Sequence, residues 1–174
     1  LSIGQVQLAS LEDVEKALSS ADNAFQSWSK VPVEERAACL NRFADLLEEH
    51  TPKLLGMLCL EAGKTWNDGI AEIREAVDFC RYYGHMAQQL MMHPLSLKGY
   101  TGELNELSLH PRGIALCISP WNFPLAIFAG QVVASLVTGN CVIAKPAEQT
   151  PLIAAFAVQL MHQAGIPIGA VQLL

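Results

Sequence analysis

Two ionisable residues stand close together in the most apolar part of the chain. After Glu106 the sequence contains only three residues of the types Lys, Arg, Asp and Glu, and two of them, Lys145 and Glu148, share the segment KPAEQTP. An ammonium group donates hydrogen bonds and a carboxylate accepts them, and burying such charges without a partner costs free energy. The segment therefore either meets a polar partner or is a solvated, exposed turn.

A second segment with polar groups, SPWNFP, spans residues 119–124. Its Asn122 carries a neutral side-chain amide that can donate a hydrogen bond. Asn is also a common N-cap residue, so Asn122 could instead cap a helix that starts at Phe123 and Pro124. Trp121, taken alone, is more typical of a buried core.

Other residues that could do chemistry are explained better by structural roles. Cys117 and Cys141 lie within apolar runs, where burial raises the pKa of a thiol and makes it unreactive. Glu61 and Lys64 are expected to serve helix termination and surface contacts. The five His residues show no metal-ligand spacing, and the sequence has no glycine-rich phosphate loop of the GxGxxG type. No metal site is predicted.

Both polar segments follow apolar runs of strand length. Residues 113–118 and 141–144 are such runs, and residues 170–174 begin a third. Helices are expected between them, from Pro124 to a stop at Gly139-Asn140 and from Thr150-Pro151 to Gly165. This alternation indicates a parallel sheet covered on both faces. The two polar segments then lie at the carboxyl ends of neighbouring strands, where ligands bind in open α/β sheets.

Residues 1–94 are predicted to form four amphipathic helices. Ser10 and Asp13 are placed to cap the first, Pro32 starts the second, Thr51-Pro52 caps and opens the third, and Gly63 closes it. The fourth runs from about Asp68 to Met91 and ends before Pro94. The expected apolar stripes are Leu11, Val14, Leu18, Ala21, Phe25 and Trp28 in the first helix, Ala37, Leu40, Phe43, Ala44 and Leu47 in the second, and Ile70, Ile73, Val77, Cys80, Tyr83 and Leu90 in the fourth.

Between these helices and the sheet, residues 95–110 predict an outward β-hairpin with a turn at Thr101-Gly102. The sequence thus divides into a helical region at 1–94, a hairpin at 95–110 and a β-α-β-α-β region at 111–174. A sheet that stops on its third strand has open edges, so we expect the chain to be part of a larger domain.

Composition excludes several classes of protein. Hydrophobic residues make up 51% of the 174, which excludes disorder, and no apolar run reaches the ~20 residues of a membrane span. The net charge of −6 argues against nucleic acid or an anionic membrane as the main partner. Five widely spaced cysteines without a CxxC pair favour free thiols in a reducing compartment, the cytoplasm.

The motifs together resemble the aldehyde dehydrogenase superfamily. The resemblance rests on ISPWNFP at 118–124, Gly139-Asn140 and KPAEQTP at 145–151, and it extends back through EAGK at 61–64. Within the superfamily, SPWNFPLAIFAGQ at 119–131, IAEIREAVDF at 70–79 and RYY at 81–83 resemble the pyrroline-5-carboxylate dehydrogenase module of bifunctional proline utilisation A. The fold implied is α/β: N-terminal helices followed by the first half of a Rossmann-like parallel sheet.

The resemblance implies roles for residues in both polar segments. Asn122 would donate to the oxygen of a thiohemiacetal, whose charge develops in the transition state. Lys145 and Glu148 would bind the adenosine ribose of NAD, and the Glu148 carboxylate would repel the 2′-phosphate of NADP. The cofactor cleft would be lined by Ile118, Ser119, Pro120 and Trp121.

The resemblance also implies an NAD-dependent oxidation of glutamate γ-semialdehyde to glutamate by a homo-oligomer, with residues 95–110 as an oligomerisation segment. The catalytic cysteine, which lies in a Gly-Gln-x-Cys context in this family, and the general base are expected beyond Leu174, so this chain alone should be inactive. A bifunctional parent would also carry FAD in a separate domain. The alternatives are a non-catalytic, truncated cofactor-binding half-domain and an enzyme for another aldehyde.

Overall fold

A computed structural model describes residues 2–174. Its N-terminal half contains four helices, α1 (Leu11–Trp28), α2 (Val33–Glu49), α3 (Thr51–Ala62) and α4 (Trp66–Met91). The predicted capping box is confirmed: the Ser10 hydroxyl accepts from the Asp13 amide, and the Asp13 carboxylate accepts from the Ser10 amide. Gly63 ends α3 in the left-handed conformation, as expected of a glycine C-cap. Thr51 does not cap α3, because its hydroxyl donates to the Leu47 carbonyl inside the helical run.

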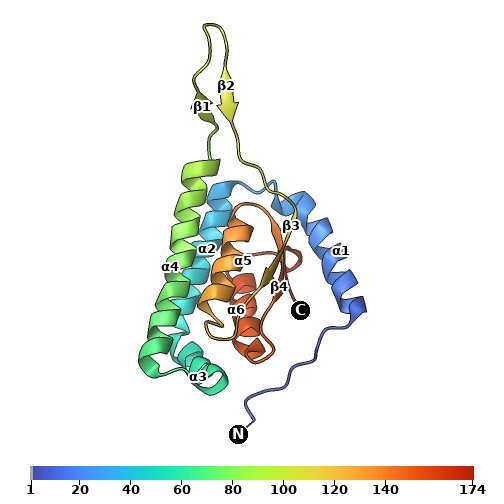
Figure 1. The fold of residues 1–174 in the computed structure, drawn as a ribbon, viewed down its shortest axis with the longest axis vertical. Helices are drawn as coiled ribbons and strands as arrows, with labels where there is room; N and C mark the ends of the chain where they lie inside the picture. The colour runs from blue at the N-terminus through green and yellow to red at the C-terminus, as the bar shows by residue number, and fades with distance from the viewer. Residues whose placement is uncertain (1) are drawn as a thin grey trace.

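A long hairpin leaves the end of α4 and projects away from the rest of the molecule (Figure 1). Its strands, β1 (Leu95–Leu97) and β2 (Asn105–Leu107), are antiparallel, with Leu95 opposite Leu107. The prediction of two outward strands is confirmed.

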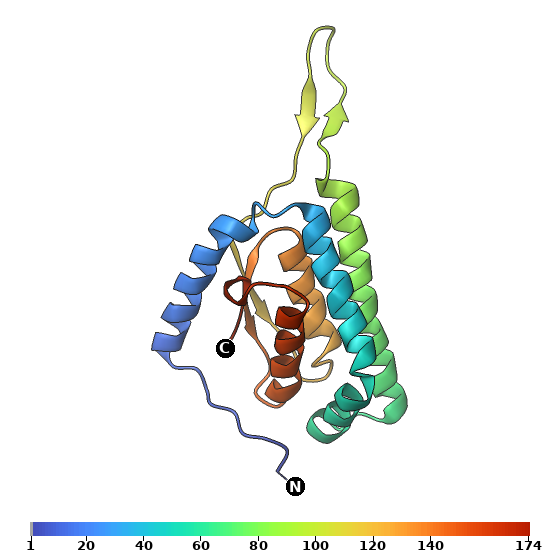
Figure 2. The same cartoon turned by 180° about the vertical axis from the view of Figure 1, so that it is seen from behind.

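The C-terminal part forms a parallel sheet in the order β3-β4-β5, from β3 (Ile114–Ile118), β4 (Cys141–Lys145) and β5 (Val171–Leu173). Helix α5 (Ala126–Val137) connects the first two strands, and α6 (Pro151–Gln163) with a short 3-10 turn, η1 (Ile168–Ala170), connects the last two. Helices α5 and α6 cover one side of the sheet, with α2 and α4 packed outside them, whereas α1 lies on the other side (Figures 1 and 2). The α/β architecture is as predicted.

The stripe predicted for α2 is the centre of the core. All five of its residues are fully buried, because α2 packs against α4 on one side and against α5 and α6 on the other. None of the helices described in residues 2–174 is long and apolar enough to cross a membrane.

Two other stripes were only partly right. In α1 the buried residues are Ala17, Ala21 and Trp28, whereas Leu11 is 85% exposed and Leu18 is also exposed. The helix contacts the sheet and η1 through small residues: a Cβ on Gly169 would lie 2.7 Å from the Cβ of Ala24. The face of α1 that carries the small residues is thus the one turned to the sheet, and the two leucines lie outside it.

In α4 the residues Ile73, Val77 and Cys80 are buried as expected, Tyr83 is half-buried, and Ile70 and Leu90 are exposed. The buried face of α4 follows Gly69, Glu72, Ile73 and Ala76, and this face meets α2, α3 and α5.

The prediction that the sheet is covered on both faces holds for β4 and fails for β3. Residues Cys141 to Ala144 of β4 are buried, but Leu116 and Ile118 of β3 are 64% and 61% exposed, and Ile114 is exposed as well. In the described residues β3 pairs only with β4, and α5 covers only the side that carries Cys117. An apolar run indicates which residues favour burial. Within residues 2–174, the side chains of Leu116 and Ile118 on β3 remain largely uncovered.

Candidate functional site

The two polar segments meet at the carboxyl edge of the sheet, as predicted. Ile118 and Lys145 are paired at the last position of the β3–β4 register. One residue later, the Ser119 amide donates to the Lys145 carbonyl at 3.1 Å. Residues 119–124, here called the Asn122 loop, and residues 145–150, here called the Lys145 loop, therefore start side by side.

Lys145 and Glu148 are partners of each other. The Lys145 ammonium donates to Glu148 Oε1 at 3.0 Å and to the Pro146 carbonyl at 3.0 Å. This bond and the positive charge lower the pKa of the Glu148 carboxyl, so it stays ionised at neutral pH and the pair is lost only as pH falls through that lowered pKa. Both side chains are exposed, which avoids the desolvation cost and leaves them accessible to a ligand.

Asn122 is exposed and does not cap a helix. Helix α5 begins at Ala126, and Leu125 occupies its N-cap position. The Leu125 side chain makes no capping hydrogen bond. The capping alternative for Asn122 is therefore wrong. Trp121 is 56% exposed, so the alternative that it is plain core is also wrong.

The cap of α5 comes from Glu72, a residue of α4 that the sequence analysis did not single out. Glu72 Oε1 accepts from the amides of Leu125 at 2.8 Å and Ala126 at 3.2 Å, and the residue is only 1% exposed. Its Oε2 lies 3.0 Å from the Lys64 ammonium. A charged residue on the apolar face of α4, next to Ile73, was the available indication of such a role.

Helix α6 is capped in the same way by Glu61 of α3. The amides of Leu152 and Ile153 donate to Glu61 Oε1 and Oε2 at 2.7 and 2.9 Å. Thr150, expected to cap this helix, occupies the N-cap position, but its side chain makes no capping hydrogen bond. The expectation of surface contacts for Glu61 and Lys64 was wrong, because both are partly buried and bind the helices behind the two loops.

These caps determine what the carboxyl edge can bind. Free amides at a helix N-terminus attract anions such as phosphate, but at α5 and α6 two amides each already bind a carboxylate of the same chain. What the loops present instead is the exposed amide of Asn122 and the ion pair of Lys145 and Glu148. These groups suit a polarised oxygen and a pair of hydroxyls.

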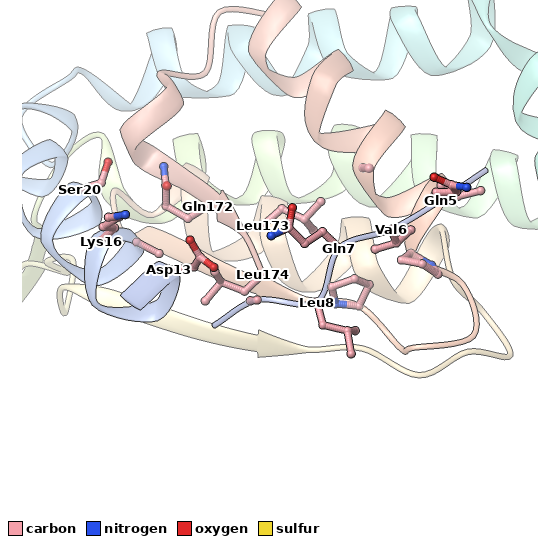
Figure 3. Close-up of a pocket in the computed structure, with 16 residues that line it drawn as sticks. Gln5, Val6, Gln7, Leu8, Asp13, Lys16, Ser20, Gln172, Leu173 and Leu174 are labelled. Carbon is pink, nitrogen blue, oxygen red and sulfur yellow. The ribbon is translucent and has the colours of Figure 1, made fainter. Parts of the chain in front are cut away.

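A cavity of about 700 Å³ adjoins the Lys145 loop. Figure 3 shows the extended segment around Gln5 to Leu8 passing on one side of it, with Leu173 and Leu174 at the end of β5 and Lys16 of α1 nearby. Pro146, Pro151 and Leu152 also line it, so an apolar wall lies next to the ion pair. A planar apolar group attached to a bound sugar could rest there.

The remaining predicted site residues lie where expected in the chain, with different degrees of burial. Ser119 is buried, and its hydroxyl donates to Gln131 Oε1 at 3.3 Å, which ties the Asn122 loop to α5. Pro120 is half-buried and Ile118 is exposed. Burial raises the pKa of the Cys117 thiol and raises that of Cys141 to about 11. In residues 2–174 no cluster of His, Cys, Asp and Glu is arranged to hold a metal ion.

Comparison with known proteins gives matches along the whole chain. The family model described as "Aldehyde dehydrogenase family" matches residues 2–174. Bifunctional protein PutA from Klebsiella aerogenes is 48% identical over 172 residues, covering 99% of this chain and 12% of that protein. The 1-pyrroline-5-carboxylate dehydrogenase of Geobacillus kaustophilus is 41% identical over 167 residues, covering 96% of this chain and 32% of that protein.

Solved structures match equally well. A crystal structure of bifunctional proline utilization A superposes with a TM-score of 0.94 at 46% identity, covering 98% of this chain and 18% of that one. A 1-pyrroline-5-carboxylate dehydrogenase from Thermus with bound NAD gives a TM-score of 0.89 at 37% identity, covering 95% of this chain and 32% of that one. The chain thus spans between about an eighth and a third of the length of these relatives.

Proposed function

Because the chain belongs to the aldehyde dehydrogenase family, we propose that it supplies the oxyanion donor and the cofactor-ribose site of an NAD-dependent dehydrogenase that oxidises glutamate γ-semialdehyde to glutamate. The meeting of the Asn122 and Lys145 loops at one sheet edge is the observation that carries this proposal. The names of the relatives, bifunctional protein PutA and 1-pyrroline-5-carboxylate dehydrogenase, support the substrate.

The Lys145 loop is proposed to hold the adenosine ribose of NAD, which supplies the hydride acceptor of the reaction when bound. Lys145 can donate to a ribose hydroxyl. Glu148 Oε2 makes no hydrogen bond within residues 2–174, so it can accept from one. The NAD-bound Thermus relative supports the choice of cofactor. Ile118, Ser119, Pro120 and Trp121 are proposed to line the cleft between the loops.

Asn122 is proposed to donate its side-chain amide to the aldehyde oxygen as negative charge develops on it. The amide is exposed, it makes no hydrogen bond within the described residues, and it is neutral, so it favours the charged transition state over the neutral aldehyde. Removal of one such donor typically lowers kcat by about 10²–10³.

We also propose a domain organisation, an oligomeric state and a cellular compartment for the protein. Residues 1–94 and 111–174 would belong to one cofactor domain, and the projecting hairpin at 95–110 would join copies in a homo-oligomer. The cytoplasm is the proposed compartment, since free thiols such as the five cysteines persist where the environment is reducing.

A second candidate is a half-domain that binds the cofactor without catalysis. For this chain taken alone, the burial of its cysteines favours the second candidate. Burial raises the pKa of four thiols, those of Cys39, Cys80, Cys117 and Cys141. These four thiols are therefore poorly suited to attack an aldehyde.

Calorimetric titration with NAD and with NADP tests the cofactor assignment. We expect tighter binding of NAD, because in the proposed ribose site the Glu148 carboxylate would lie near the 2′ position and repel a phosphate there. In Glu148→Gln this repulsion is lost, and the preference for NAD should shrink by about tenfold, which corresponds to roughly 1.4 kcal/mol. Glu103→Gln, on the exposed hairpin, serves as a charge-matched control. Preference of the unmodified protein for NADP would contradict the ribose assignment.

A further inference from the structure

We propose that Glu72 is a positioning residue for Asn122: its buried carboxylate, together with Lys64, holds the loop that presents the Asn122 amide to the substrate. The proposal rests on the function proposed above for Asn122. It adds Glu72 and Lys64, two residues of the helical region that do not touch the substrate, to the residues on which the reaction depends.

Glu72 fixes the chain directly after Asn122. Its Oε1 accepts from the amides of Leu125 and Ala126, three and four residues beyond Asn122, at 2.8 and 3.2 Å. Two bonds from one oxygen to successive amides set both the position and the direction of the first turn of α5. The negative charge also interacts favourably with the helix N-terminus.

Lys64 holds the loop at a second point. Its ammonium lies 3.0 Å from Glu72 Oε2 and 3.9 Å from the centre of the Phe123 ring. Phe123 directly follows Asn122, so an ammonium over this ring restrains the peptide that carries the Asn122 side chain. The carboxylate and the ring thus share one cation.

The start of the loop is anchored separately. The Ser119 amide binds the Lys145 carbonyl and the Ser119 hydroxyl binds Gln131. With both ends held, Asn122 needs no hydrogen bond of its own to keep its place, and its amide remains free for the substrate. A donor preorganised in this way is what stabilisation of a developing charge requires.

Capping of α5 gives the Glu72 carboxylate a stabilising role, but it does not explain the buried partner Lys64. A buried ion pair pays a large desolvation cost, and apolar side chains of similar size often serve as well or better. The Glu72–Lys64 pair is almost wholly buried. A requirement for placement of the Asn122 loop gives the Lys64 ammonium, which contacts both Glu72 and the Phe123 ring, a role beyond the cap.

A double-mutant cycle in the full-length protein that carries this segment tests the proposal. The variants are Glu72→Gln, Asn122→Ala and the two combined. The measured quantities are kcat/KM for glutamate γ-semialdehyde and the Kd of NAD. We expect Glu72→Gln to lower kcat/KM by about ten- to a hundredfold, as displacement of a catalytic group does, with the Kd of NAD unchanged.

In the Asn122→Ala background, Glu72→Gln should cause no further loss, because the amide that it positions is gone. Losses that multiply would overturn the proposal. If Asn122→Ala keeps full kcat/KM, the function proposed for Asn122 fails, and the positioning role falls with it. A fall in NAD affinity equal to the fall in kcat/KM would indicate a general structural role and would likewise overturn it.

Two further variants secure the interpretation. Glu75→Gln changes an exposed glutamate one turn along the same helix and should alter neither quantity. If Glu72→Gln alone does not fold, Lys64→Met combined with Glu72→Gln removes both buried charges at once. Adding Asn122→Ala to this double variant should likewise cause no further loss of kcat/KM beyond that of Asn122→Ala alone. Losses of kcat/KM that multiply would count equally against the proposal.

Discussion

Burial of four cysteines, Cys39, Cys80, Cys117 and Cys141, suppresses the thiolate form of each. Burial raises the pKa of Cys80 to about 12 and that of Cys141 to about 11, and raises those of Cys39 and Cys117 as well. At pH 8 only about one in ten thousand Cys80 thiols and one in a thousand Cys141 thiols would be ionised. Because the thiolate is the reactive form, both residues are poor nucleophiles at neutral pH.

The raised pKa values of Cys80 and Cys141 predict the rates at which a reagent labels the thiols of the native 174-residue chain. At pH 8 we expect slow or no reaction of Cys80 and Cys141 with a thiol reagent, measured residue by residue by mass spectrometry. The half-buried Cys59 should be labelled before them. Labelling of the two deep thiols should speed up as pH rises towards their pKa values, since the thiolate fraction grows about tenfold per unit. In denaturant all five should react alike, and rapid native labelling of Cys80 at pH 8 would show that it is not enclosed as described.

Helix ends in this chain depend on side chains distant in sequence. Glu61 lies 91 residues before Leu152, yet it accepts the first amides of α6 with both oxygens. The two bonds attach α3 to α6 directly behind the Lys145 loop. Loss of the carboxylate would leave two partly buried amides unpaired.

Replacement of this cap should destabilise the fold. For Glu61→Ala we expect a loss of about 1–2 kcal/mol in the free energy of unfolding, the usual effect of removing a helix cap, measured by urea denaturation. Glu49→Ala, at the exposed end of α2, is the matched control and should change stability by less than about 0.5 kcal/mol. Equal effects of the two substitutions would show that the bonds to Leu152 and Ile153 contribute nothing.

Local pattern was enough to predict elements, and it failed where distant parts of the chain decide the outcome. All five residues of the predicted α2 stripe are buried because α2 is enclosed on two sides, and for the same reason Val33, Arg36 and Cys39, which were not predicted, are buried as well. For α1 the periodicity gave the right side of the helix only in part: Ala21 and Trp28 are buried, whereas Leu11 and Leu18 are exposed where the helix approaches Gly169 through the small residue Ala24.

The site shows the same division. Strand ends and motif spacing predicted that Lys145 and Glu148 would flank the Asn122 loop, because parallel strands bring their carboxyl ends to one edge. The residues that support these loops lie in the helical region: Glu61, Lys64 and Glu72. The amides that Glu72 and Glu61 bind lie 53 to 92 residues further along the chain. No local rule connects a glutamate with a helix that far along the chain.

At the scale of the molecule, the chain leaves several large apolar side chains uncovered. Leu116 and Ile118 on β3 and Trp121 in the Asn122 loop are exposed, and so are Tyr100 and Leu104 on the hairpin that projects away from the sheet (Figure 1). Groups of exposed apolar side chains are typical of interfaces. This exposure agrees with the small share of each relative that the chain covers.

The 174-residue chain on its own is therefore expected to produce no NADH from NAD and glutamate γ-semialdehyde. It holds the proposed Asn122 donor and the proposed ribose site, but burial raises the pKa of its deep thiols, which makes them poor nucleophiles at neutral pH. Absorbance at the NADH band reports the reaction, and a cooperative thermal transition confirms that the sample is folded. The full-length protein is the positive control. NADH formation by the folded chain above the enzyme-free blank, abolished by Asn122→Ala, would show that one of its own residues acts as the nucleophile.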